Sequence, residues 1–303
     1  MKYSFLLIVF FWLIFFPFGS YAQRYDYADD PYYRSKYQFE IGGSVGVMNC
    51  FTDLGGTKGL GGSFLKDLNI KNTQPAGSIY FTAYYRSFIA LRFEGTFGRV
   101  RASDDVLGTG DRIALYRYTR NLSFRSNINE VMLVAEIHPL YAREFKQGRK
   151  IPLLSPYLVG GIGLFTFSPQ AKLNGEWVYL RSLSTEGQGF PEYPDRKRYS
   201  LQQICLPLGG GVKYKLSPLF NTSVEVVYRI LNTDYLDDVS TNYIDREVFS
   251  KNFTGKQLEQ ALLLHDRKYG VDPNLSSFPG EQRGNPDVND SYFTFNIKIG
   301  LVL

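Results

Sequence analysis

The sequence predicts an eight-stranded antiparallel transmembrane β-barrel with long extracellular loops, one of which carries a short helix. Three observations predict this fold: segments in which apolar and polar side chains alternate, ionic residues confined to one face of those segments, and connections that alternate between short and long. A period of two places successive side chains on opposite faces of a strand. The 44% content of hydrophobic residues excludes a disordered chain, and two cysteines exclude a disulfide scaffold.

The clearest strand is 292–303. Every odd-numbered residue from Phe293 to Leu303 is apolar, while the even-numbered face carries Asn296 and Lys298. A tilted strand of about 9–11 residues crosses the hydrocarbon layer of a bilayer, so this segment is long enough to do so. Seven other segments show the same alternation, although 157–167 and 206–216 are interrupted by glycines: 37–47, 79–85, 89–98, 130–138, 157–167, 206–216 and 224–230.

The polar faces of these strands carry charges that a closed barrel accommodates and a sandwich core does not. Buried charges are costly unless they are paired, and a narrow polar lumen of mixed sign meets that need. A soluble β-sandwich is the alternative fold. The residues expected to form this lumen charge network are Glu40, Arg92, Glu94, Glu130, Glu136, Glu225, Arg229 and Lys298.

Connection lengths set the orientation of the barrel. Short turns on one side and long loops on the other are typical of outer-membrane barrels, whose long loops face outward. In the longest loop, 255–269 is expected to be helical, with Leu258, Leu262 and His265 on one side. The short connections fall at 87–88, 143–152 and 217–219, and the long ones at 49–75, 100–127, 168–200 and 232–290.

The N-terminus indicates export. A lysine at position 2, an apolar run and a small-residue cleavage motif at 20–22 predict a signal peptide over 1–22. An uncleaved membrane anchor is the alternative. The mature chain is then divided into a periplasmic arm at 23–36 and the outer-membrane barrel at 37–303.

Several stretches resemble a known family. They are 120–124 (RNLSF), 128–130 (INE), 155–157 (SPY), 183–189 (LSTEGQG), 233–243 (TDYLDDVSTNY), 283–286 (RGNP) and 290–292 (DSY). In this order they are similar to the outer-membrane β-barrel family that includes PorG, a component of the type IX protein secretion system. The loop residues that carry the resemblance are Glu186, Gln188, Asp234, Tyr235, Asp237, Asp238, Arg283 and Asn285.

The resemblance implies a non-enzymatic outer-membrane protein that associates with the periplasmic ring of that secretion system. An eight-stranded barrel is only wide enough for its own side chains, so it cannot conduct folded cargo. We therefore expect an anchor or adaptor whose partners are outer-membrane lipid and periplasmic ring proteins. The alternative is a surface protein whose long loops bind an extracellular ligand or another outer-membrane protein.

Other chemistry has weaker support. Asp234, Asp237 and Asp238 are weak candidates for Ca²⁺ ligands, but their spacing differs from an EF-hand, and pairing with Arg181, Arg196 or Arg198 is the alternative. His138 and His265 would be the residues of a hydrolase, yet no nucleophile motif accompanies them. We therefore expect no enzyme activity, no catalytic or metal site, no cofactor, no nucleic acid and no small-molecule substrate. Cys50 and Cys205 are expected to be unpaired thiols.

Overall fold

The computed structural model describes residues 36–55, 70–107, 112–147 and 152–303. The expected signal peptide at 1–22 lies outside the described residues, and so does the expected arm at 23–36 apart from its last residue, Lys36. Residues Lys36–Leu303 form one compact unit. In the described residues, no helix is long and apolar enough to cross a membrane.

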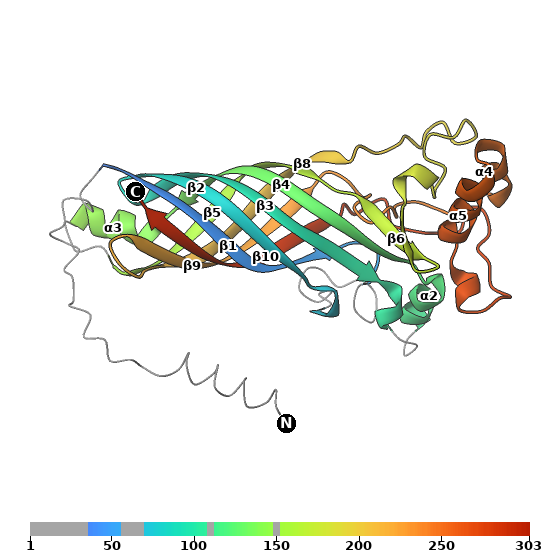
Figure 1. The fold of residues 1–303 in the computed structure, drawn as a ribbon, viewed down its shortest axis with the longest axis horizontal. Coiled ribbons are helices and arrows are strands. Elements are labelled where there is room, and N and C mark those ends of the chain that lie inside the picture. Colours follow the sequence, from blue (N-terminus) through green and yellow to red (C-terminus); the bar gives the residue numbers. More distant parts are fainter. Residues whose placement is uncertain (1–35, 56–69, 108–111, 148–151) are drawn as a thin grey trace, which may run out of the picture. The chain divides into compact units, whose positions relative to one another are not determined.

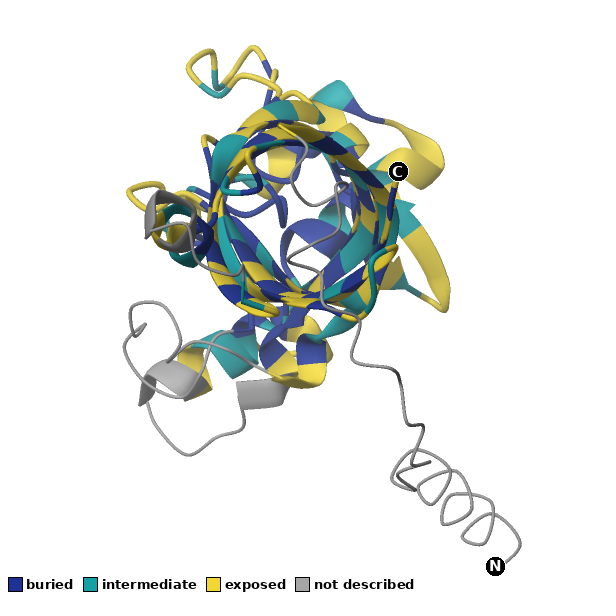
Figure 2. Ribbon diagram, turned by 90° about the vertical axis from the view of Figure 1, so that its left-hand side faces the viewer, coloured by how far each residue is buried: buried dark blue, intermediate teal, exposed yellow. Residues whose placement is uncertain are grey.

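Eight antiparallel strands of the described chain close into a barrel (Figures 1 and 2). Going around the wall, the order is β3-β2-β1-β10-β9-β8-β5-β4, and pairing of β4 with β3 completes the circle. The predicted fold class is confirmed. The barrel strands are β1 (Tyr37–Phe51), β2 (Gln74–Tyr85), β3 (Ile89–Ser103), β4 (Ser123–Ile137), β5 (Leu154–Thr166), β8 (Gln202–Lys215), β9 (Phe220–Leu231) and β10 (Ser291–Val302).

Short connections lie at the end of the barrel that holds the C-terminus (Figure 1). Tyr85 pairs with Ile89, and the turn between them places Arg86 and Ser87 at positive φ angles of 51° and 60°. Between β4 and β5, a helix replaces the expected simple turn: α3 (Pro139–Gln147) begins at a proline, which suits the first turn of a helix because it has no N–H to satisfy there.

The opposite end carries the long loops and most of the remaining structure (Figure 1). A hairpin of β6 (Pro169–Leu173) and β7 (Glu176–Tyr179) extends the sheet from β4, through pairing of Arg125 with Gln170. The other elements are short helices: η2 (Ile70–Asn72), η3 (Asp104–Leu107), α2 (Arg112–Arg120), η4 (Arg181–Leu183), α4 (Arg246–Asn252), α5 (Gly255–His265) and η5 (Lys268–Gly270).

The predicted helix at 255–269 is correct in place but too long. It ends at His265, because the carboxylate of Asp266 accepts hydrogen bonds from the backbone N–H groups of Lys268 and Ser277 and turns the chain away. Helix α4 was not predicted from the sequence. Its N-cap is Asp245, whose side chain accepts a hydrogen bond from the N–H of Glu247.

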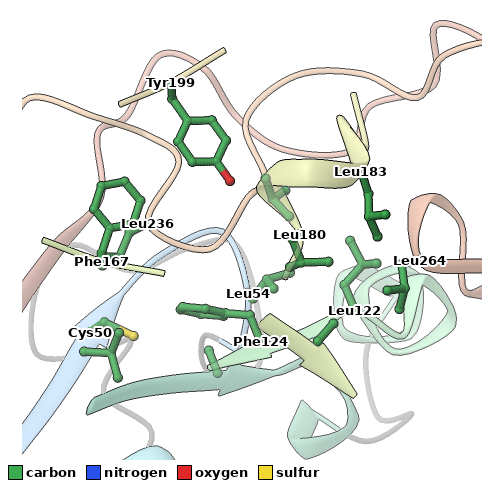
Figure 3. Close-up of a cluster of buried hydrophobic side chains, with 14 of the residues drawn as sticks. Cys50, Leu54, Leu122, Phe124, Phe167, Leu180, Leu183, Tyr199, Leu236 and Leu264 are labelled. Carbon is green, nitrogen blue, oxygen red and sulfur yellow. The ribbon is translucent and has the colours of Figure 1, made fainter. Parts of the chain in front are cut away.

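A hydrophobic core lies where the loops meet the barrel mouth (Figure 3). Cys50 and Phe124 come from barrel strands, Leu183 and Leu236 from the loops, and Leu264 from α5. All five side chains are buried. The long loops therefore pack together as one folded cap and do not extend separately from the barrel. We call this assembly of the long loops the loop cap; it comprises the described residues of 52–55, 70–73, 104–122, 167–201 and 232–290.

The wall of the barrel alternates between exposed and buried residues, as the ring in Figure 2 shows. Outward-facing Ile41, Val45 and Leu158 are 51%, 72% and 62% exposed, whereas inward-facing Arg92 and Lys298 are each 1% exposed. No second sheet of the described chain covers the outward rows. The sandwich alternative therefore does not hold, and the outward belt is apolar.

Glycines make room for large side chains inside the narrow lumen. A Cβ atom at Gly42 would lie 2.5 Å from the ring of Tyr80, and one at Gly211 would lie 2.8 Å from the ring of Tyr157. Each tyrosine ring fills the space that a side chain at the paired glycine of the adjacent strand would otherwise occupy. The glycine runs that interrupted the predicted strands are therefore part of the lumen packing.

We expect Leu133→Arg to destabilise the barrel in a lipid bilayer. Leu133 lies in the middle of the outward belt and is 45% exposed. An arginine on the lipid face at mid-depth costs about 2–4 kcal/mol. Urea unfolding in phosphatidylcholine vesicles measures the change. The matched control is Leu275→Arg, at a loop leucine that is 38% exposed; equal losses for both variants would contradict a lipid-facing belt.

Candidate functional site

The lumen contains a dense network of ion pairs centred on Arg92 of β3. Its guanidinium lies 2.9 Å from Glu94, 2.6 Å from Glu136 and 2.8 Å from Glu225. Lys298 of β10 bridges two of the same carboxylates, at 2.7 Å from Glu94 and 2.8 Å from Glu225. Strands β3, β4, β9 and β10 are thereby connected across the lumen.

A second ion pair lies nearer the loop end. Arg229 of β9 lies 3.0 Å from Glu130 of β4, and it also donates a hydrogen bond of 2.5 Å to Thr294. The thiol of Cys205 donates to Glu130 as well, at 3.3 Å. Both cysteines are buried free thiols, and Cys205 fills a polar role here. The buried carboxylate of Glu130 is thus fully engaged by its surroundings.

Glu40 belongs to a third group near the short-turn end. It accepts hydrogen bonds from Asn221 at 2.7 Å and from Tyr80 at 2.9 Å. Its cationic partner is Lys213, at 3.3 Å. The structure therefore places all eight residues of the expected lumen network inside the barrel, where each is at most 2% exposed: Glu40, Arg92, Glu94, Glu130, Glu136, Glu225, Arg229 and Lys298.

Sequence reasoning missed two lumen residues, Lys213 and Lys215 on β8. They are 5% and 7% exposed. The glycines at 209–211 hid the alternation, but Cys205 and Pro207 give the inward phase that continues to both lysines. With them, the described lumen holds five carboxylates and five basic side chains: Glu40, Glu94, Glu130, Glu136 and Glu225 against Arg92, Lys213, Lys215, Arg229 and Lys298.

His138 helps to fill the short-turn end of the lumen. Its ring stacks against Tyr141 of α3 and Tyr157 of β5, with centroids 5.2 Å and 5.0 Å away. Its Nε2 lies 3.3 Å from Glu136. Among the described residues, no serine or threonine hydroxyl bonds to this ring, which packs between the two tyrosine rings.

His265 is likewise packed inside the loop cap. Its Nδ1 lies 2.6 Å from the carbonyl oxygen of Thr185, and its ring contacts those of Tyr243 and Phe249. Burial, together with the nearby charge of Arg283, lowers the pKa of His265 to about 4. The imidazole is therefore neutral at neutral pH and orders the cap by its contacts.

The residues that carry the family resemblance meet in the loop cap. Arg283 lies 2.9 Å from Glu186 and donates a hydrogen bond of 2.7 Å to the carbonyl oxygen of Asp238. Glu186 also accepts from the backbone N–H groups of Ser240 and Thr241, each at 3.0 Å. One buried ion pair thus joins three separate parts of the loop sequence.

Other residues that carry the family resemblance surround the Arg283–Glu186 ion pair, and we call this group of contacts the junction. Gln188 accepts a hydrogen bond of 3.0 Å from the N–H of Glu186 through its side-chain oxygen. The carboxylate of Asp238 accepts from Tyr199 at 2.6 Å, and the ring of Tyr199 stacks on Tyr235 with centroids 4.8 Å apart. These residues act as structural connectors of the cap.

Arg120 links the junction to the barrel rim. It forms an ion pair of 2.8 Å with Asp104 and donates to the carbonyl oxygen of Arg283 at 2.6 Å. It also donates to the carbonyl oxygen of Asp53, whose carboxylate accepts a hydrogen bond of 2.7 Å from the N–H of Asn285. The end of β1 and the last loop are therefore connected.

Four aspartates of the loop cap, Asp53, Asp234, Asp237 and Asp290, interact as a buried cluster. Burial, together with the charges of Asp53 and Asp237, raises the pKa of Asp234 to about 9. Burial raises the pKa of Asp53 to about 6, and the pKa values of Asp237 and Asp290 rise well above the usual range for the same reason. The cluster therefore favours protonated carboxyl groups.

The three weak Ca²⁺ candidates separate into two environments. Asp234 and Asp237 belong to the aspartate cluster, whereas Asp238 is held by Tyr199 and Thr185. Across the described residues, no group of three or more His, Cys, Asp or Glu side chains is arranged to hold a metal ion.

The expected pairing of these aspartates with Arg181, Arg196 or Arg198 is wrong. Arg181 donates to the carbonyl oxygen of Tyr199, and Arg196 donates to the carbonyl oxygens of Glu186 and Asn242. Backbone carbonyls of the folded loop accept hydrogen bonds from these guanidinium groups. Among the described residues Arg198 forms no ion pair, and its side chain lies against Gly189.

The chain matches no protein-family model, and no curated protein is similar enough to count as a match. Among solved structures, it resembles Ail, the attachment invasion locus protein of Yersinia pestis, with 9% identity, a TM-score of 0.35, and coverage of 88% of this chain and 97% of Ail. It also resembles Neisserial surface protein A (10% identity, TM-score 0.38, 88% and 97% covered) and the outer membrane protein OprG of Pseudomonas aeruginosa (11%, 0.35, 88% and 95%). Likenesses this distant carry no argument about what the chain does.

The class of protein follows from the barrel itself. A bilayer interior tolerates strands only where closure leaves no unpaired edge, and here β3–β4 pairing closes the wall. The outward rows are apolar and the lumen is ionic, which is the arrangement of outer-membrane barrels. The chain is an integral outer-membrane β-barrel of eight strands.

We expect Arg229→Met to destabilise the barrel by about 3–5 kcal/mol, because it leaves the buried Glu130 without its cation. Adding Glu130→Leu should restore much of the loss, since the unpaired charge is then removed. Urea unfolding in vesicles measures both variants. The control is Lys256→Met, whose pair with Glu176 is exposed, so the expected cost stays under about 1 kcal/mol. A double variant as unstable as Arg229→Met would refute the argument.

We expect the loop cap to loosen as the pH rises. A carboxyl group with a raised pKa in the folded state stabilises that state below its ordinary pKa, and this contribution is lost as the pH rises through the folded value, about 9 for Asp234. Hydrogen exchange of the 233–241 amides, corrected for intrinsic rates, should show more opening at pH 9.5 than at pH 6. Asp234→Asn should reduce the difference, while Asp195→Asn, at an exposed loop residue, should leave it unchanged. Equal protection at both pH values would contradict the expectation.

Proposed function

We propose that the chain acts as a non-enzymatic anchor or adaptor in the outer membrane, and that it does so as part of a type IX protein secretion system. The observation that carries the first part is the filled lumen. Arg92, Lys298 and their carboxylate partners occupy its middle, and Tyr80 and Tyr157 pack beside them. A barrel whose interior is occupied in this way works through its outer surfaces.

The secretion role rests on the resemblance of the loop sequences. Its residues, among them Glu186, Asp238 and Arg283, meet in one buried junction of the loop cap. This supports the proposal that the family members share a loop cap held together by the same residues. The adaptor surface itself belongs to the opposite end, where α3 and the short turns would face a periplasmic ring.

The second candidate is a surface protein that binds an extracellular ligand or another outer-membrane protein through the loop cap. The observation that favours it is the order of the cap, which has its own hydrophobic core and buried ion pairs (Figure 3). On its surface, Phe278 and Val288 are 65% and 60% exposed. A folded loop surface with exposed apolar side chains is suited to contact a partner.

Two variants distinguish the candidates in cells that secrete type IX cargo. The turn variant replaces 143–152 with a short turn and keeps Tyr141, whose ring packs against His138. The cap variant is Phe278→Ser combined with Val288→Ser. The adaptor proposal expects the turn variant to reduce secreted cargo to the level of a gene deletion, while the cap variant secretes normally.

The controls test folding and location. Both variants should reach the outer membrane in wild-type amounts and migrate as folded barrels on unheated gels. Normal cargo secretion after gene deletion would refute the secretion role. Loss of secretion in the cap variant alone would instead favour binding through the loops.

A further inference from the structure

On the lipid-facing wall, the described strands carry charge at one place only. In the described strands, the outward positions of β1, β2, β5, β8, β9 and β10 hold no charged residue. The exceptions are Arg99 and Arg101 on β3 and Arg125 on β4. No carboxylate shares the outward rows of these eight strands, so the three arginines form an unbalanced positive patch. We call it the arginine patch.

Strand register brings these side chains together. Arg101 lies directly opposite Arg125 in the β3–β4 pair, and Arg99 lies opposite Asn127. Like charges directly opposite each other destabilise a strand pair. Neither Arg101 nor Arg125 has an ion pair with a described carboxylate, so no negative charge in the described wall offsets this repulsion. An anion bound from outside would offset it.

Neutral contacts hold two of the side chains in place. Arg99 donates a hydrogen bond of 2.8 Å to the side-chain oxygen of Asn127. Arg125 donates to the side-chain oxygen of Gln170 at 2.9 Å, and its guanidinium lies 3.6 Å from the ring centroid of Trp177 on β7. Each leaves guanidinium N–H groups available to a ligand. The patch is therefore ordered before any ligand binds.

The patch begins where the apolar belt ends. The outward positions of β3 from Ile89 to Phe97 are uncharged, and Arg99 is the next outward residue. That apolar stretch is nine residues long, which matches the strand length of about 9–11 residues that crosses the hydrocarbon layer. Trp177 and Tyr179, 38% and 58% exposed, lie on the neighbouring hairpin, and such aromatic residues favour the membrane interface. The arginines thus lie at headgroup depth on the loop side.

We propose that the arginine patch binds the phosphate group of a phosphorylated lipid in the membrane leaflet on the loop side of the barrel. A guanidinium offers paired N–H donors that match phosphate oxygens. A lipid is favoured over free phosphate because its acyl chains would lie along the apolar wall directly below the arginines. The inference depends on the barrel lying in the membrane and is independent of the secretion role.

The position of Trp177 provides a direct reporter. The chain has two tryptophans, and Trp12 lies in the expected signal peptide, so the exported protein carries Trp177 alone, beside Arg125. The exported protein, purified in nonionic detergent, is titrated with phosphorylated lipid A while the tryptophan emission is recorded. We expect a saturable change in emission. The same lipid after phosphatase treatment, and inorganic phosphate at equal concentration, should give no saturable change.

Variants at the patch test which residues bind. Arg101→Gln should weaken the apparent affinity about fivefold, since each arginine near a membrane surface contributes to this extent. Arg99→Gln combined with Arg101→Gln should weaken it about 25-fold by the same reasoning. Arg101→Lys keeps the charge and should retain most of the binding. The matched control is Lys197→Gln, an exposed cation of the loop cap, which should bind as the parent does.

All variants should migrate as folded barrels on unheated gels, so that a loss of binding is separated from a loss of fold. Equal responses to lipid before and after phosphatase treatment would overturn the proposal, because the phosphate would then be irrelevant. So would unchanged affinity in the double variant. A saturable response to inorganic phosphate at the same concentration would also overturn it, by showing an ion site rather than a lipid site.

Discussion

The neutralisation of charge inside a narrow closed wall is the constraint on which the rest of this structure depends. Backbone hydrogen bonds join only neighbouring strands, whereas the lumen ion pairs join strands that face each other across the barrel. Lys298 on β10 reaches Glu94 on β3, and Arg229 on β9 reaches Glu130 on β4. A one-residue slip in register would turn these groups toward lipid and the apolar rows inward. The ion pairs therefore specify one register.

The loop cap extends the same solution beyond the membrane. Arg120 with Asp104 and Arg283 with Glu186 are buried pairs whose remaining donors bond to backbone carbonyls of other loops. Apolar side chains from the strands and loops pack around them (Figure 3). The aspartate cluster departs from this pattern, because burial and mutual repulsion favour protons there instead of a basic partner. We therefore expect order in the cap to depend on pH, whereas the lumen pairs are balanced by opposite charges.

The fold was predictable because a period of two is a local property of the sequence. The parity of Phe293 to Leu303 could be read directly, and so could that of Arg92 and Glu94. Lys213 and Lys215 were not predicted to face the lumen, because a glycine has no side chain to show which face of the strand is polar. The contacts of the cap could not be predicted for a different reason. Glu186 and Arg283 are far apart in sequence, and only the folded loops bring them within 2.9 Å. Loop pairing is a tertiary property that no local pattern encodes.

An occupied interior restricts what such a barrel can do. The groups that could move ions or bind substrate in the lumen are already engaged with one another, so their exchange for a ligand would require breaking several buried pairs at once. We therefore expect recognition to take place on the outside of the molecule. On the outward rows of the described strands, charge is confined to Arg99, Arg101 and Arg125, which lie just beyond the apolar belt. Like charges directly opposite each other destabilise a strand pair, so a counter-charge bound from outside, as proposed above, would relieve that cost.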